Sequence, residues 1–211
     1  MKGLLSFLTL FIILWFNILL SVCQTGSFSG ETDNYVKLIN ESFRQQNWDG
    51  GKKLIDKALK EDPTDVEVRT LLGKYYYEQR LYDQARYELL GVLDLNRNYV
   101  GAKQILVNVE MDSKRYSSAI CYINELLEVN PYWKGLWMKK IQAYRIQGNR
   151  EEANRLLKRL SQIYPEDTEI REAYLYNIEE ELVEKKNRGE LNQAIALSED
   201  LIEKDPHNDV V

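Results

Sequence analysis

The sequence predicts an all-α fold, a solenoid built from antiparallel pairs of helices. Two residue types recur on one 34-residue step. On this step lie Pro63, Pro131 and Pro165, and also Ala85, Ala119 and Ala153, with two steps between the first two prolines. A period of this length is typical of helix–turn–helix repeats, in which each unit buries its apolar face against its neighbours.

Composition agrees with a helical, folded chain and excludes several classes of function. Of the 211 residues, 29% are charged and 44% hydrophobic, with only 4 Pro and 11 Gly, which excludes a disordered chain. The formal net charge is -5, and no stripe of Lys and Arg stands out. Nucleic acid is therefore not an expected partner.

The N-terminal residues predict export from the cytoplasm. Lys2 precedes an apolar run over 4–22, and a polar stretch over 24–31 reads as a linker. We interpret 1–23 as a cleaved signal peptide, with two alternatives left open. An uncleaved membrane anchor fits because the run exceeds the usual ~7–15 residues. Lipid attachment at Cys23 fits because the preceding residues resemble a bacterial lipobox. All three place the remainder in the periplasm or at the membrane, outside the cytoplasm.

The proline step divides the chain into an array over 32–208. The expected repeats are 32–65, 66–99, 100–133, 134–167 and 168–208. In the fifth, Pro206 follows Pro165 by 41 residues, so 7 additional residues must lengthen the first helix by about two turns. Residues 209–211 read as the start of a further, truncated repeat.

Residue types at fixed positions add a second pattern. The second repeat has Leu72, Gly73, Tyr76, Ala85 and Leu89; the fourth has Trp137, Tyr144, Gly148, Ala153, Leu157 and Pro165. This pattern resembles the tetratricopeptide repeat family over about 32–206. The resemblance implies a right-handed superhelical solenoid that binds other proteins in a concave groove.

Several of these residues have a mechanical reason for their type. The small residue at position 20 of each repeat lets the second helix approach the first closely. Proline ends the second helix because it cannot continue the hydrogen-bond ladder. Gly148 and Gly189 fall in the turns between paired helices, where a positive φ is often required. Cys121 lies in a predicted helix and is expected to be a packed, inert thiol.

No set of residues in the sequence predicts catalysis or a bound group. His207 is the single histidine and lies in the unfinished last repeat, so no histidine-based triad or metal cluster is expected in the body. Phosphate-binding glycine motifs and a C-x-x-C motif are absent from the sequence. We therefore expect no enzyme activity, no metal and no cofactor.

The resemblance also gives candidate binding residues. In the family, first helices line the groove, and position 9 carries Asn40, Lys74, Asn108 and Gln142 here, with Gln104 and Arg145 nearby. Three of the four position-9 residues are amides, which can donate to and accept from a peptide backbone at once. These residues are expected to hold an extended segment of a protein or peptide partner. The alternative is that they merely solvate an empty face.

The sequence thus predicts an exported, non-catalytic scaffold or adaptor for protein–protein interaction. A second interpretation stays open, a structural or sensory repeat domain of a longer, truncated protein. Both start from the same helical repeats.

Overall fold

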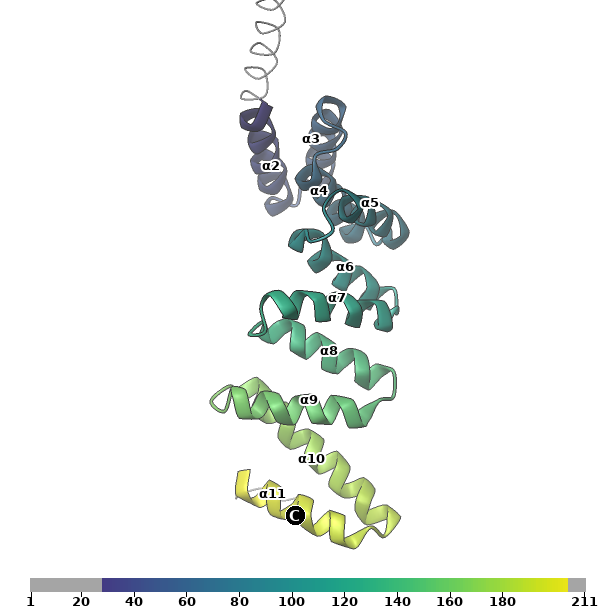
Figure 1. The fold of residues 1–211 in the computed structure, drawn as a ribbon, viewed down its shortest axis with the longest axis vertical. Helices are drawn as coiled ribbons and strands as arrows, with labels where there is room; N and C mark the ends of the chain where they lie inside the picture. The colour runs from purple at the N-terminus through teal and green to yellow at the C-terminus, as the bar shows by residue number, and fades with distance from the viewer. Residues whose placement is uncertain (1–27, 205–211) are drawn as a thin grey trace, which may run out of the picture. The chain divides into compact units, whose positions relative to one another are not determined.

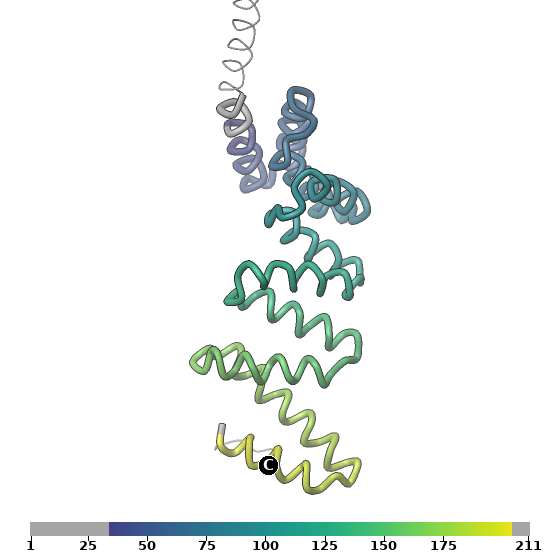
Figure 2. The backbone as a smooth tube through the Cα atoms, in the orientation of Figure 1, coloured from purple at the N-terminus to yellow at the C-terminus, as the bar shows by residue number. Residues whose placement is uncertain are grey.

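The computed structural model describes residues 28–204, and every regular element in this range is an α-helix (Figure 1). In chain order these are α2 (Phe28–Arg44), α3 (Trp48–Glu61), α4 (Val66–Glu78), α5 (Tyr82–Leu95), α6 (Val100–Asp112), α7 (Tyr116–Val129), α8 (Lys134–Ile146), α9 (Arg150–Ile163), α10 (Thr168–Arg188) and α11 (Leu191–Lys204). Within each unit described below the chain reverses direction after every short turn (Figure 2). The predicted all-α solenoid of helix pairs is confirmed.

Helix starts follow the 34-residue step. Helices α4, α6, α8 and α10 begin at Val66, Val100, Lys134 and Thr168, the first residues of the expected repeats. The linker expected over 24–31 needs a correction, because α2 already begins at Phe28. No proline interrupts the residues just before position 32, so the helix extends back by a full turn. The expectations on 1–23, on His207 and on 209–211 lie outside the described residues.

Short polar side chains fix several helix starts. The Asp65 carboxylate accepts hydrogen bonds from the backbone N–H groups of Glu67 and Val68, both at 2.9 Å. The Asn47 side chain accepts from Gly50 N at 2.9 Å in the same way. Such caps satisfy backbone donors that have no partner inside the helix and typically contribute about 1 kcal/mol each.

The turn between paired helices holds one residue with positive φ in every repeat. These residues are Gln46 (58°), Arg80 (59°), Lys114 (61°), Gly148 (78°) and Gly189 (72°). The first four are spaced by 34 residues, so the conformation belongs to the repeat itself. Glycine, which adopts it without strain, occupies only two of the five turns.

The chain divides into two compact units, which we call the N-terminal unit (to Ser113) and the C-terminal unit (from Lys114). In the N-terminal unit α2, α3 and α4 share one core. Its buried members are Ile39, Phe43, Ile55, Ala58, Val68, Leu71 and Leu72. Gly51, at position 20, lies so close to Phe43 that a Cβ there would stand 2.5 Å from the ring.

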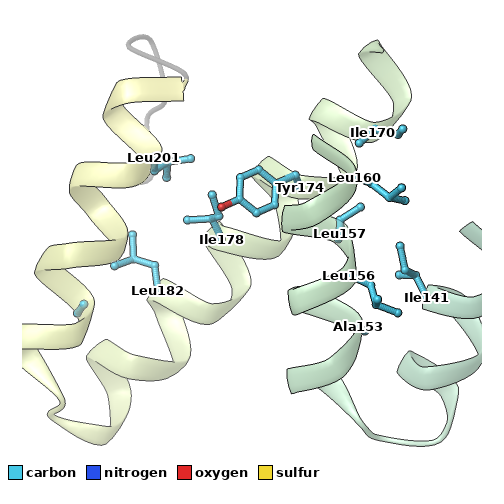
Figure 3. Close-up of a cluster of buried hydrophobic side chains, with 11 residues drawn as sticks. Ile141, Ala153, Leu156, Leu157, Leu160, Ile170, Tyr174, Ile178, Leu182 and Leu201 are labelled. Carbon is cyan, nitrogen blue, oxygen red and sulfur yellow. The ribbon is translucent and has the colours of Figure 1, made fainter. Parts of the chain in front are cut away.

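The core of the C-terminal unit joins α8 to α11 (Figure 3). Leu156, Leu157 and Leu160 of α9 form its centre, and Ile178 and Leu182 of α10 extend it toward α11. The small residues Ala153 and Ala194 are 0% and 5% exposed. Packing on both sides of α9 and α10 thus links the last two repeats into one core.

The first helix of the fifth repeat is longer than its counterparts. Helix α10 has 21 residues, whereas α4, α6 and α8 have 13 each. Its glycine C-cap, Gly189, ends it in the left-handed conformation. Over the part of the chain that the structure describes, no helix is both long enough and apolar enough to span a bilayer.

Cys121 corrects one expectation, because its side chain is exposed rather than packed. Helix α7 buries Ala119 and Ile123. Cys121 stands two residues from each, which is roughly 200° around the helix. It therefore falls on the solvent side of α7.

Candidate partner-binding surface

The N-terminal unit carries four of the six predicted binding residues. Asn40 lies on α2, Lys74 on α4, and Gln104 and Asn108 on α6. Helix α4 packs against both α2 and α6, so Asn40, Lys74 and Asn108 occupy matching positions on three successive neighbours. Gln104 is exposed, while the other three are half-buried.

Lys74 has a partner inside the molecule. Its Nζ lies 5.8 Å from the centroid of the Phe43 ring, within the range of a cation–π interaction. The Lys74 ammonium therefore lies against an aromatic ring of α2, and this contact favours one orientation of the side chain.

The C-terminal unit carries the other two predicted residues, both on α8. Gln142 is exposed. Arg145 is half-buried, and its Nη2 donates a hydrogen bond to Oδ1 of Asn177 on α10. The structure therefore brings Arg145 together with α10, a helix from which no binding residue was predicted.

A cleft of about 750 Å³ opens between α8, α9 and the lengthened helix α10. We call it the α10 cleft. Its walls are lined by Arg145, Arg150, Glu151, Asn154, Tyr176, Asn177, Glu180, Glu181, Glu184, Lys185 and Arg188. Four cations and four carboxylates are among the lining residues, so the cleft suits a polar or charged ligand rather than an apolar one.

A chain of amides forms the floor of the α10 cleft. Asn177 is 6% exposed, and its Nδ2 donates to Oδ1 of Asn154. Asn154 in turn donates from Nδ2 to Glu181 Oε2 at 3.0 Å. Buried amides without partners are costly, so this network fixes the side chains that it joins. Arg145 is thereby held in one orientation by a neutral group.

The remaining cations of the cleft have carboxylate partners. Glu184 forms an ion pair with Arg150 at 3.6 Å and accepts a hydrogen bond from Arg188. Lys185 lies 2.6 Å from Glu190, and this hydrogen bond lowers the pKa of the Glu190 carboxyl. Among the ion pairs of the described residues none involves Arg145. Its guanidinium is the cation of the cleft best placed to receive an anionic group.

Tyr176 adds a hydroxyl and a ring at the rim. Its Oη donates to Glu180 Oε1 at 3.0 Å, and this hydrogen bond raises the pKa of the phenol. The side chain is 56% exposed. A partner segment entering the cleft would meet an aromatic face beside the Arg145 guanidinium.

The residues that α10 contributes were missed from the sequence. The one signal was the 7-residue excess of the fifth repeat, which supplies the turns carrying Glu184, Lys185 and Arg188. No metal centre competes for this surface: within residues 28–204 no three His, Cys, Asp or Glu side chains group as ligands.

Comparison with known proteins adds the fold type. No family model matches the sequence, and no curated protein matches it either. Among solved structures, a tetratricopeptide protein of Thermus thermophilus, TTC0263, is 22% identical, with a TM-score of 0.53 over 84% of this chain and 94% of that one.

Two further structures agree. MamA is 20% identical, with a TM-score of 0.61 over 83% of this chain and 92% of its own. YrrB, a tetratricopeptide protein with an unusual peptide-binding site, is 15% identical, with a TM-score of 0.60 over 83% of this chain and 87% of its own. The fold is that of a tetratricopeptide repeat protein. The helix pairs of this chain are thus similar to those of proteins with which it has little sequence in common.

Proposed function

We propose that this tetratricopeptide array is a non-catalytic scaffold outside the cytoplasm that holds an extended segment of a protein partner. The α10 cleft of the C-terminal unit is its main contact. The observation that carries the proposal is Arg145, fixed by a buried amide at the edge of a 750 Å³ polar cleft.

The chemistry of the surface favours a peptide. Exposed amides such as Gln104 and Gln142 can donate to and accept from peptide groups at the same time. Arg145 adds a planar cation, which suits an acidic side chain of the partner. The similar fold of YrrB, which has a peptide-binding site, supports this class of ligand.

Export follows from the N-terminal residues. Lys2 and the apolar run after it have the order of charge and hydrophobicity that directs a chain to the export machinery. The proposed partner is therefore a protein of the envelope or the membrane. No catalytic step is assigned to this scaffold.

The test uses the full chain, immobilised and presented with a displayed library of short linear peptides. We expect selected peptides to share acidic residues. Arg145→Ala should weaken the binding of a selected peptide by roughly 1–3 kcal/mol. The double variant Asn108→Ala/Gln142→Ala should weaken it by a similar amount per desolvated group.

Lys158→Ala is the matched control, since this cation is exposed on α9 and lies outside the lining of the cleft. Its affinity should equal that of the wild type. Failure to enrich any peptide over bare resin would count against the proposed function, and so would equal binding by the wild type and Arg145→Ala.

A further inference from the structure

Helix α11 has a second apolar face besides the one that packs on α10. Ala194 and Leu201 are buried in the core. Leu191, Ile195 and Ile202 are 65%, 55% and 49% exposed. At 100° per residue the three exposed residues fall within roughly 40° of one another around the helix. We call Leu191, Ile195 and Ile202 the α11 stripe.

The matching positions in earlier repeats contact a neighbouring helix. Positions matching Ile195 contact the first helix of the following repeat elsewhere in the array: Arg86 bonds Glu110 on α6, and Asn154 bonds Glu181 on α10. The α7 residues Ile120 and Leu127, which match Ile195 and Ile202, are 8% and 7% exposed. Ile195 and Ile202 are thus apolar at the positions where second helices meet another helix.

One position near the end of the first helix also bonds the first helix of the following repeat. Tyr77 donates to Asp112 on the next first helix, and Arg145 donates to Asn177 in the same way. Lys186 stands at the matching place in the fifth repeat, 41 residues after Arg145, and is exposed. The fifth repeat therefore has an exposed cation at the position that bonds the following first helix in two earlier repeats.

The first repeat has a different surface at the positions that would meet such a stripe. Positions filled by buried Val68 and Val109 in the second and third repeats hold exposed Asn34 and Glu41 in the first. Glu41 accepts from Gln45 Nε2 at 2.8 Å and pairs with Arg44 at 2.7 Å. This polar face of α2 does not complement an apolar stripe, which argues against head-to-tail stacking of copies.

We propose that the α11 stripe binds the same stripe of a second copy, with the two α11 helices antiparallel about a two-fold axis. The contact is self-complementary, as such an axis requires. Charge selects the direction: exposed Lys186 lies close to Leu191 in the chain, and exposed Glu199 and Glu203 lie at the other end of α11. Antiparallel pairing brings opposite charges together twice, whereas parallel pairing brings like charges together.

The test places a cysteine on the proposed axis. Ser198 lies on the stripe side of α11, between Ile195 and Ile202, and replacing it removes no apolar side chain. In the full chain in mild detergent, with Cys23→Ser and Cys121→Ser, Ser198→Cys should form a disulfide dimer of about twice 24.8 kDa on a non-reducing gel. Gln193→Cys, exposed on the opposite side of the same helix, is the control and should stay monomeric.

Sedimentation of the same full chain supplies a second readout. Ile195→Lys should weaken the dimer at least about tenfold, because it buries a charge in an apolar contact. A monomer for Ser198→Cys overturns the proposal, as does equal cross-linking of both cysteine variants. A monomer whose Ser198→Cys thiol resists a maleimide would show that another segment of the same molecule covers the stripe, which also overturns it.

Discussion

The two units use charged residues at their repeat junctions in opposite ways. In the N-terminal unit Arg86 of α5 pairs with Glu110 of α6 at 2.6 Å, and Glu110 is only 3% exposed. The same guanidinium donates to Ser113 Oγ at 2.9 Å. In the C-terminal unit the junction of α9 with α10 opens into a cleft whose charges reach solvent.

The difference shows that the same kind of repeat can form either a packed junction with a buried ion pair or a junction that leaves a cleft. A buried pair is held by its partners, and removing one of them leaves a charge without water. The ion pairs of the α10 cleft are partly exposed and contribute little to stability, so they are free to serve recognition. The predictions below test this contrast, from the largest expected effect to the smallest.

Arg86→Ala should be the most damaging change. It leaves the Glu110 carboxylate buried and unpaired, which costs roughly 3–5 kcal/mol. Chemical denaturation followed by circular dichroism measures the loss. Arg150→Ala, at the exposed 3.6 Å pair with Glu184, should cost less than about 1 kcal/mol. Equal losses for the two variants would remove the contrast between the junctions.

Two helical glycines give a matched pair across the units. A Cβ on Gly73 of α4 would stand 2.6 Å from the Leu89 side chain, so Gly73→Ala should destabilise by about 1–3 kcal/mol. A Cβ on Gly135 of α8 would meet nothing within 4 Å. Gly135→Ala should stabilise by about 0.5–1 kcal/mol. Midpoints of urea unfolding that shift the same way in both variants would contradict this packing.

Two tyrosines link stability to alkaline pH. Tyr77 donates to Asp112 and Tyr174 to Asp200, each at 2.9 Å, and burial followed by these hydrogen bonds raises the pKa of both phenols. Because the folded pKa lies above the ordinary value of 10, their stabilisation is complete below pH 10 and is lost as the pH rises further. Tyr77→Phe should cost about 1 kcal/mol at neutral pH.

The same variant should also flatten the loss of stability above pH 10. Urea unfolding at two pH values, one on each side of 10, checks both effects. Tyr87→Phe is the control, since this ring is 72% exposed. An alkaline slope equal to that of the wild type in Tyr77→Phe would contradict the role given to the Asp112 bond.

The turn residues should give the smallest effects. Gly148→Ala places a Cβ at φ 78° and should cost about 1 kcal/mol. Arg80→Gly relieves the same strain at φ 59° but loosens the unfolded chain, so its gain should be only a few tenths of a kcal/mol. Thermal unfolding of both variants is the measurement. A loss of stability in Arg80→Gly would mean that its side chain makes a stabilising contact.

The fold was readable from the sequence because local rules act in every repeat. Proline, small residues and turn residues recur on one step, and stacking of similar hairpins leaves few other ways to bury the apolar faces. Cys121 was misjudged because a helix alone does not say which side faces the core. Its distance from Ala119 and Ile123 in the helical period was the overlooked signal.

The binding surface was readable only in part. Arg145, a groove residue expected from its place in the repeat, lines the α10 cleft, whereas Asn177, which accepts its hydrogen bond, was not expected there. The excess length of α10 was visible in the sequence. The position of that helix against α9 depends on tertiary packing around Leu157 and Tyr174, which no spacing of residues encodes.

Hydrogen exchange of the full chain with and without a selected peptide tests the central claim most directly. If the α10 cleft is the binding site, bound peptide should slow exchange in α8, α9 and α10, and Arg145→Ala should abolish the slowing. Protection confined to the helices of the N-terminal unit, or protection unaffected by Arg145→Ala, would contradict the account.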